Sequence, residues 1–341
     1  LYQVLAKRRS ERGALDFEGQ EVRFDFDEEG AIAAIKPYER NEAHRLIEEC
    51  MIAANVAAAT FLKRAKIPAL YRVHARPPLH KYEDLANFLG SIGFTLPDAA
   101  ELAPADLAAL LAKARKRPDR ALIEAVILRS QSLAVYAPEC DGHFGLALSA
   151  YAHFTSPIRR YPDLLVHRAI HHAIAGGKAA DYWYTPVAMA ELGRLTSSTE
   201  RRAEEASREV DERLKCAYME RHVGDEFDGV VTGVASFGLF VDITELRVTG
   251  MLHVTQLPND YYHFDAKRHR LSGERMCLSF QLADRVRVKV LRVDTVERRI
   301  DLRLAGEAET RAEQRERVDR ERGRPQHQKG GGRRGGRGRR R

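Results

Sequence analysis

The hydrophobic pattern of the chain changes at Gly224, and this change divides the fold into two parts. Before it, apolar residues recur at helical spacing, most regularly over residues 41–66, where Leu46, Cys50 and Ala54 share one stripe. After it, residues 224–304 are a series of short strands separated by turns. We therefore predict an α+β chain: a mixed helix and sheet part, then an all-β five-stranded barrel of the OB type.

The pattern predicts three segments, residues 1–222, 223–305 and 306–341. The last is rich in Gly and Arg, cannot build a core and is typical of a disordered basic tail. Residues 322–341 hold nine Lys or Arg and no acid, whereas the whole chain has a net charge of +7, so the remainder is slightly acidic. Such an arm binds polyanions, RNA among them, by phosphate contact and counterion release.

The first segment should contain one hairpin and several helices. Over residues 22–35 apolar and polar side chains alternate, which places Val22, Phe24 and Phe26 on one face. Asp25 and Asp27 could be imagined as metal ligands, but acids on the exposed face of a hairpin are the simpler interpretation. The other predicted elements are helices at 1–12, 81–90, 119–131 and 191–221, strands at 14–18 and 144–148, and a connection at 97–118 without chemistry.

The cysteines and the hydropathy profile indicate a cytoplasmic protein. Cys50, Cys140, Cys216 and Cys277 lie far apart and form no C-x-x-C pair, which argues against a disulfide framework and for a reducing compartment. No apolar run reaches the roughly 18 residues that a membrane-spanning helix needs. We expect no membrane partner.

Residues 153–168 (HFTSPIRRYPDLLVHR) are predicted to form a stiff loop followed by a helix. Pro157 and Pro162 restrict the backbone on either side of Arg159 and Arg160, so both arginines lose little freedom on binding. A guanidinium held in this way can offer paired N–H donors to a phosphate. Two adjacent arginines could instead pair with carboxylates, but two prolines, Thr-Ser and a tyrosine beside them favour phosphate contact.

Asp163 occupies the position where a helix N-cap is expected, and such a helix start is a natural anion site. Together with Ser156 and His153 it has the residue types of a hydrolase triad. We reject that interpretation, because the sequence has no nucleophile elbow and two of the three residues lie in one constrained loop.

The arginine loop also carries a family resemblance. TSPIRRYPD resembles the catalytic domain of the ribonuclease R family, the RNB-type exoribonucleases, and so do the stretches at residues 12–18 (RGALDFE), 42–55 (EAHRLIEECMIAAN) and 142–154 (GHFGLALSAYAHF). The four stretches stand in that family's order. The resemblance implies a processive 3′-to-5′ hydrolytic exoribonuclease that releases nucleoside 5′-monophosphates.

The resemblance also assigns roles to individual residues. Arg159 would act on the charge that develops at phosphorus, with Arg160 and Tyr161 binding the substrate beside it. Phe17 would stack on a base near the 3′ end, although it could equally be an ordinary core residue of a strand. Glu49, preferred over Glu48, would bind the ribose 2′-hydroxyl, which distinguishes RNA from DNA. The alternative for Glu49 is an ion pair with Arg45 on the same helix.

The strands FGLFV and GMLHV look like an S1-motif RNA-binding domain. Its expected binding face carries Phe237, Phe240 and His253, because exposed rings on a sheet are favourable where bases stack on them. The alternative is that one or two of these rings point into the barrel. RNA, chiefly single-stranded 3′ ends, is the expected partner, and we expect a monomer.

The expected cofactor is Mg²⁺, held by carboxylates that activate water and neutralise the leaving oxygen. In the resembled family an aspartate cluster for the metal lies upstream of the region that corresponds to Arg12, and we find no such cluster in this chain. We therefore expect an N-terminally truncated fragment, because the chain starts at Leu1 within a running helix. The alternative is a non-catalytic RNA-binding or ribosome-associated protein that uses the barrel and the tail.

Overall fold

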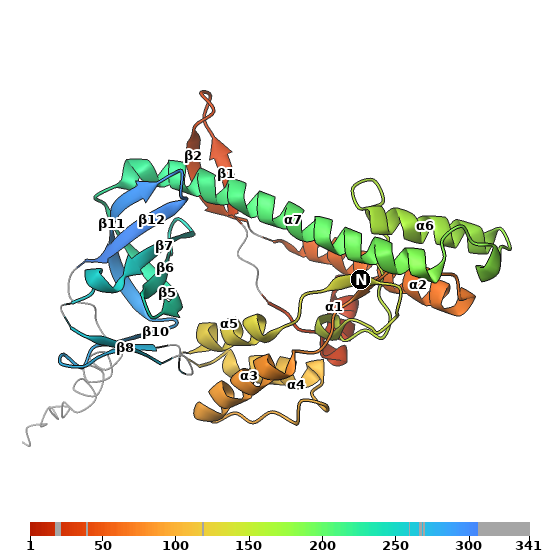
Figure 1. Cartoon of the computed structure of the whole chain (residues 1–341), viewed down its shortest axis with the longest axis horizontal. Helices are drawn as coiled ribbons and strands as arrows, with labels where there is room; N and C mark the ends of the chain where they lie inside the picture. The colour runs from red at the N-terminus through yellow and green to blue at the C-terminus, as the bar shows by residue number, and fades with distance from the viewer. Residues whose placement is uncertain are drawn as a thin grey trace, which may run out of the picture.

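The computed structural model describes residues 1–17, 22–38, 40–117, 119–258, 260–265, 268 and 270–305. Figure 1 shows a helical part and a barrel that are connected by the long helix α7 (Pro186–Met219). This helix begins five residues before the predicted start, where Thr185 accepts a hydrogen bond from the backbone N–H of Ala188 at 3.2 Å. The predicted fold class is confirmed: a mixed helix and sheet part precedes a closed five-stranded barrel.

One core of the helical part surrounds a small two-stranded sheet. The sheet pairs β3 (Tyr71–Val73) with β4 (Val135–Ala137), and helices α2 (Glu42–Ala65), α6 (Tyr161–Ile174) and α7 pack on it. Ala58 and Ala59 on α2 are buried in this core, because small side chains allow close approach of the neighbouring elements. The predicted helix at 41–66 is confirmed.

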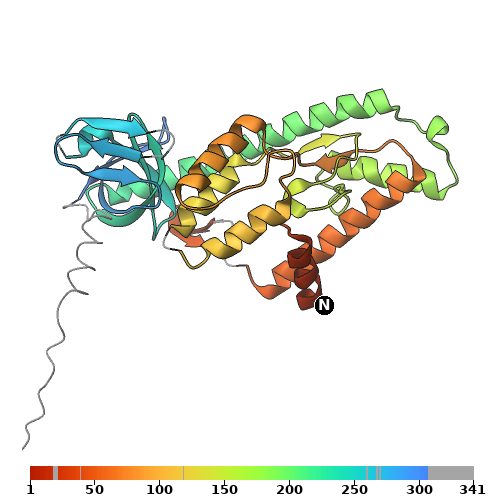
Figure 2. The ribbon, with the colours of Figure 1, turned by 90° about the horizontal axis from the view of Figure 1, so that it is seen from below.

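A second core forms among α3 (Leu79–Ser91), α4 (Pro104–Ala114) and α5 (Arg120–Ser130), which lie together in Figure 1. Leu107 and Ile123 are fully buried in it, and Leu282 of the barrel part joins them. Helix α1 (Tyr2–Arg12) crosses α2 close to the N-terminus, as Figure 2 shows. The expectation of a connection at 97–118 was wrong, since α4 occupies half of it.

The predicted hairpin forms, with β1 (Val22–Phe26) paired to β2 (Ile32–Pro37). Ile32 and Ile35 are buried in the same core as the barrel, so the hairpin belongs in space to the second half of the chain. Val22 and Phe24 pack against that core as predicted, whereas Phe26 is 55% exposed. The strand register shifts between Asp25 and Phe26, which breaks the alternation of faces there.

The barrel closes in the strand order β11-β12-β7-β6-β5, with only the β12–β7 pair parallel. A separate three-stranded sheet, in the order β10-β9-β8, lies beside it. The barrel strands are β5 (Glu226–Ala235), β6 (Gly238–Ile243), β7 (Val248–His253), β11 (Arg285–Asp294) and β12 (Arg299–Leu304), and the others are β8 (Tyr262–Asp265), β9 (Arg270–Gly273) and β10 (Ser279–Gln281).

Two predicted strands of the helical part do not form. The described part of the first, residues 14–17, is irregular, and the second contains the short 3₁₀ helix η1 (Phe144–Leu146). Gly142 and Ala147 adopt positive φ angles of 84° and 52°, which fold this stretch back on itself. The N–H of His143 donates to the carbonyl of Leu148 at 2.7 Å and closes the turn. The alternation of apolar residues there reflects a tight turn, so the strand prediction was wrong.

Candidate active site and nucleic-acid interface

The loop at residues 155–160, here called the arginine loop, is held by one buried carboxylate. Asp163 is fully buried, and its Oδ1 accepts hydrogen bonds from the backbone N–H of Ser156 and from Nη2 of Arg160, both at 2.8 Å. Asp163 is not the N-cap that the sequence suggested, because α6 starts two residues earlier and its N-cap is Arg160. The carboxylate reaches back from the first turn of the helix and fastens the loop.

The two adjacent arginines have different environments. Arg160 forms the ion pair with Asp163 and keeps only 22% of its side chain exposed. Arg159 is exposed and forms no ion pair with any residue that the structure describes. Both backbone N–H groups donate to the carbonyl of Ser156, which keeps the turn tight. The carboxylate alternative therefore applies to Arg160, while the guanidinium of Arg159 remains available to a ligand.

Helix α2 supports the arginine loop from behind. The side chain of Asn55 donates to the hydroxyl of Tyr151 at 3.0 Å and accepts from the backbone N–H of Phe154 at 2.9 Å. Phe154 stacks on His167 of α6, with ring centroids 4.2 Å apart. These contacts connect the approach to the loop with two helices, so the loop is preorganised on a rigid base.

The histidines behind the loop are uncharged at neutral pH. Burial is the main cause that lowers the pKa of His153 to about 3, and it does the same to His143. Nδ1 of His153 forms a hydrogen bond with the hydroxyl of Tyr136 at 2.8 Å. His153 thus bonds to a tyrosine, and Asp163 bonds to the backbone of Ser156, which is not the geometry of a hydrolase triad.

A cavity of about 660 Å³ opens where α1, α2, α4 and α5 meet. Phe17 and Glu49 both line it, so the structure brings together two of the predicted site residues. Arg159 does not line it. The segment that leads into its loop bonds through Phe154 to Asn55, which lies six residues beyond Glu49 on α2, or roughly 9 Å along the helix axis. Other lining side chains are those of Arg9, Asp16, Tyr38, Arg40, Arg45, Glu48, Leu111, Arg115, Arg120 and Glu124.

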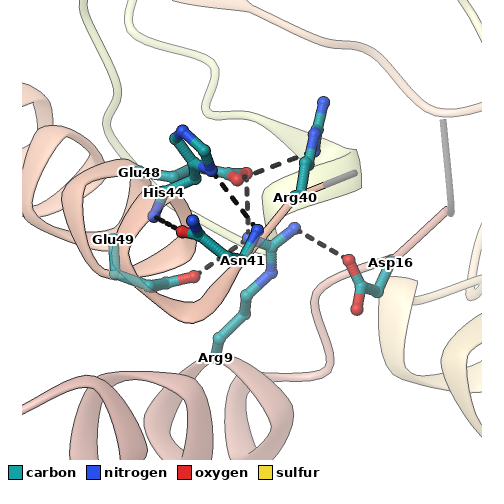
Figure 3. Close-up of polar contacts among 7 residues, drawn as sticks. All are labelled: Arg9, Asp16, Arg40, Asn41, His44, Glu48 and Glu49. Carbon is teal, nitrogen blue, oxygen red and sulfur yellow. Dashed lines mark hydrogen bonds and ion pairs between the residues drawn. The ribbon is translucent and has the colours of Figure 1, made fainter. Parts of the chain in front are cut away.

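Glu49 is buried and paired with an arginine that the sequence did not indicate. Its Oε1 lies 2.9 Å from Nη1 of Arg9 on α1, as Figure 3 shows. The sequence offered Arg45 as the ion-pair partner, and the ion pair found among the described residues is with Arg9 instead. Only 7% of Glu49 is exposed, against 42% of the Glu48 side chain, so Glu49 is the more enclosed of the two acids.

Two further predicted substrate contacts, Phe17 and Tyr161, are partly exposed. Phe17 is partly buried against the core of α3, α4 and α5 and forms part of the cavity wall, so both interpretations of this ring have support. Tyr161 is 43% exposed at the start of α6, beside the arginine loop. A hydrogen bond with Tyr184 raises the pKa of Tyr161.

The predicted aromatic face of the barrel is present. Phe237 and Phe240 are 47% and 37% exposed, and their rings lie edge to face with centroids 6.1 Å apart. His253 lies on the neighbouring strand opposite Gly238 and is half-buried. Its Nδ1 forms a hydrogen bond with the Thr255 hydroxyl at 2.8 Å. Neither phenylalanine belongs to the buried core of the barrel, so both rings are exposed at its surface.

Helix α5 connects the two candidate regions, a role that the sequence did not reveal. Arg120 and Glu124, near its start, line the cavity. Arg129, near its end, donates to the carbonyl of Thr232 on β5 at 2.6 Å. The hydroxyl of Thr232 in turn donates to the carbonyl of Phe240. Arg129 lies five residues after Glu124, so the cavity and the barrel contact are roughly 8 Å apart along this helix.

The described residues contain no group of three or more His, Cys, Asp or Glu side chains that could hold a metal ion. The charged cluster in the cavity consists of acids that are paired with arginines.

Among the described residues, no helix is long and apolar enough to cross a membrane.

Comparison with known proteins identifies both halves of the chain. The sequence model of the RNB domain matches residues 1–176, and that of the S1 RNA binding domain matches residues 220–304. Ribonuclease R of Vibrio cholerae is 49% identical over 314 residues, which are 89% of this chain and 38% of the relative. Ribonuclease R of Escherichia coli is 45% identical with the same coverage. The chain thus spans about 38% of the length of these relatives.

The fold is similar to solved structures of the same kind. The apo form of Mycoplasma genitalium RNase R superposes with a TM-score of 0.82 at 25% identity, covering 89% of this chain and 48% of that one. The same protein in complex with ribose methylated single-stranded RNA gives a TM-score of 0.80, also at 25% identity and with the same coverage. The arrangement of helices and barrel is therefore shared.

Proposed function

The chain belongs to the ribonuclease R family, and on this premise we propose that it is part of a hydrolytic exoribonuclease that degrades RNA processively from the 3′ end to nucleoside 5′-monophosphates. Residues 1–222 would form the C-terminal portion of the catalytic domain and residues 223–305 the S1-type binding domain. The basic tail, 306–341, lies outside the described residues and would add phosphate contacts. We propose a cytoplasmic monomer that acts on single-stranded 3′ ends.

The observation that supports this proposal is the arrangement along α2. A partly buried ring, Phe17, and a buried carboxylate, Glu49, share one cavity, and Phe154, which leads into the arginine loop, bonds to Asn55 further along the same helix. A terminal nucleotide placed in the cavity would stack on Phe17 and donate its 2′-hydroxyl to Glu49. Its phosphate would lie toward Arg159, whose guanidinium has no ion pair among the described residues.

The roles of the two arginines follow from their contacts. The ion pair between Arg160 and Asp163 keeps the loop in shape. Arg160 therefore contributes to binding by holding Arg159 in position. Arg159 is preorganised by the tight turn and would stabilise the charge that develops on phosphorus. Buried polar atoms without partners among the described residues, including Thr155 Oγ1 and Asp163 Oδ2, are typical of a loop shaped for function rather than for stability.

We further propose that RNA reaches the cavity from the barrel along α5. One end of this helix bonds through Arg129 to β5, whose partner strand β6 carries Phe240, and the other end lines the cavity. Sequence-tolerant stacking on the barrel would keep hold of the strand while the terminal nucleotide is removed, as processive degradation requires.

Mg²⁺ is the proposed cofactor, but the described residues do not provide a site for it. Glu48, Glu49 and Asp16 gather around the guanidinium of Arg9, which occupies the place that a cation would need. We therefore assign no step of the reaction to a metal held by these residues. Carboxylates other than these would have to form the Mg²⁺ site.

The deciding experiment replaces Arg159 in the full-length protein. Arg159→Ala should abolish the Mg²⁺-dependent shortening of a 3′-tailed RNA while sparing most of its RNA affinity, because the residue acts on the transition state. Arg208→Ala is the matched control, since this exposed arginine lies on α7 outside the loop and pairs with Glu212 at 3.9 Å. Equal turnover in Arg159→Ala would remove Arg159 from the catalytic role.

The same assay tests a second candidate function. The exposed aromatic face of the barrel would suffice for a non-catalytic RNA-binding or ribosome-associated protein. Tight RNA binding by the full-length wild-type protein, without any shortening of the RNA at any Mg²⁺ concentration, would favour that function over the nuclease.

A further inference from the structure

Arg9, on the last turn of α1, contacts three carboxylates at once. Its Nη1 lies 2.9 Å from Glu49 and 3.4 Å from Glu48, and its Nη2 lies 3.4 Å from Asp16. Figure 3 shows the guanidinium between these acids, with Glu48 and Glu49 coming from α2 and Asp16 from the segment after α1. All four residues line the cavity.

The three contacts are not equivalent. The side chains of Asp16 and Glu48 are 73% and 42% exposed, so water solvates both, and Glu48 has a second cation in Arg40 at 3.7 Å. Exposed pairs of this kind contribute little to stability. Glu49 is buried, and its ion pair among the described residues is with Arg9. A buried carboxylate needs a charged or hydrogen-bonding partner, so Glu49 depends on Arg9 far more than the other two acids do.

We propose that Arg9 is a positioning residue that orients the carboxylate of Glu49 for recognition of a ribose 2′-hydroxyl. This inference rests on the proposed function of Glu49. Arg9 engages Oε1, which leaves Oε2 to accept a hydrogen bond from the hydroxyl. An ionised carboxylate is an acceptor only, which suits a hydroxyl donor. Arg9 would thus determine the preference for RNA over DNA without touching the nucleotide itself.

The charge state of Arg9 agrees with this role. Burial alone would lower the pKa of Arg9, but the hydrogen bond to Glu49 and the charges of Asp16, Glu49 and Glu48 outweigh that effect and raise it. The guanidinium therefore remains a permanent cation. The contacts to Asp16 and Glu48 help to hold its plane, which fixes the direction of the bond to Glu49.

A simpler role for Arg9 would be to fasten α1 to α2. The two roles differ in what they predict for ribose selectivity. If Arg9 only holds α1 against α2, its loss changes the affinity for all nucleic-acid ligands alike. If Arg9 is a positioning residue, its loss changes the affinity only for ligands that carry the 2′-hydroxyl, and only while Glu49 is present. A double-mutant cycle between the two residues separates these cases.

The experiment measures binding of the full protein in EDTA, so that no turnover occurs, to two single-stranded oligoadenylates. One is all RNA. The other is tested as a series, in which each member carries a single 2′-deoxy nucleotide at a different position from the 3′ end. At one position, wild type should prefer the ribose form by about tenfold or more, the usual worth of a hydrogen bond to a charged acceptor. Arg9→Ala and Glu49→Gln should each remove most of this preference, and Arg9→Lys should keep part of it.

The control and the double variant complete the test. Arg8→Ala should leave the preference intact, because Arg8 points to Glu11 on the exposed side of α1. Adding Arg9→Ala to Glu49→Gln should not reduce the preference further. Circular dichroism and thermal unfolding establish that each variant is folded, and Arg9→Lys covers the case in which Arg9→Ala is not.

Two outcomes separate a failure of this inference from a failure of the proposed function. If Glu49→Gln loses the ribose preference while Arg9→Ala and Arg9→Lys both keep it, Arg9 has no positioning role. If wild type binds RNA but shows no ribose preference at any position, the role of Glu49 itself is wrong and the inference falls with it.

Discussion

The cavity with its arginine loop and the aromatic face of the barrel are two candidate RNA contacts of opposite character. The first depends on buried charges: Glu49 and Asp163 are enclosed, and each is held by an arginine. The second depends on exposed rings, with Phe237 and Phe240 lying edge to face at the barrel surface.

On the proposed function, this difference separates two properties of the chain: discrimination between ligands and general affinity for RNA. Buried ion pairs are directional and leave a polar group unsatisfied when the ligand lacks its partner, so they distinguish ligands. A ring stacks on any base, so on the proposed function the barrel face would hold RNA of every sequence. Changes to the first region should therefore alter stability and selectivity, and changes to the second should alter affinity alone.

Asp163→Ala should give the largest effect. It leaves Arg160 and the N–H of Ser156 without their buried acceptor, and removal of one partner from a buried ion pair costs about 3–5 kcal/mol. Urea unfolding monitored by hydrogen exchange should show the loss in α6 and α2. The control is Asp228→Ala, an exposed barrel acid 3.5 Å from Arg287, which should change stability very little. A loss of equal size in both variants would contradict the contrast between the regions.

The double variant Phe237→Ala/Phe240→Ala should come second. Each stacked base that is lost costs roughly 1–3 kcal/mol, so RNA affinity should fall by at least tenfold. Folding stability and the ribose preference should stay as in wild type, because both rings are exposed. Leu291→Ala, another exposed apolar residue of the barrel part, is the control. Unchanged RNA affinity in the double variant would mean that the barrel binds RNA through another surface.

Acidification should weaken the helical part before the barrel. The pKa of His153 and of His143 is about 3 in the folded protein, whereas an unfolded histidine takes up its proton near pH 6.5. The unfolded state is therefore favoured as the pH falls below 6.5, by about 1 kcal/mol per pH unit for each histidine. Urea midpoints should decrease from about pH 7.5 to about pH 5.5.

Two variants check that these histidines cause the pH dependence. His153→Gln should reduce the slope of stability against pH, since it removes one of the two groups that protonate only on unfolding. His80→Gln, at an exposed position on α3, should leave the slope as it is. The assignment would be wrong if His153→Gln and wild type lost stability in parallel.

The smallest effect on the chemistry should come from truncation after Leu304. This removes the basic segment, whose nine Lys or Arg lie in residues 322–341. RNA binding should weaken and depend less on salt, because fewer counterions are released, while turnover in the full-length protein should continue. A salt dependence equal to that of the complete chain would show that the tail makes no phosphate contacts.

Local features of the sequence predicted much of the fold. Helical periodicity located α2, α3, α5 and α7 to within a few residues, and the change at Gly224 located the barrel. Predictions failed where the backbone turns within a short stretch: positive φ at Gly142 and Ala147 converted an expected strand into a turn. The pattern of apolar residues reports which side chains are buried, but it does not report the path of the backbone between them.

The candidate site was predictable only in part, for the same reason. By itself the sequence determined the stiff arginine loop, the exposed rings of the barrel and the fold class, because these depend on neighbouring residues and on periodicity. Only the tertiary structure decided that Arg9 and not Arg45 pairs with Glu49, that Arg159 and not Arg160 remains available, and that the β1–β2 hairpin joins the barrel core. Arg9 and Glu49 are 40 residues apart, and a contact over that separation exists only once packing brings α1 against α2.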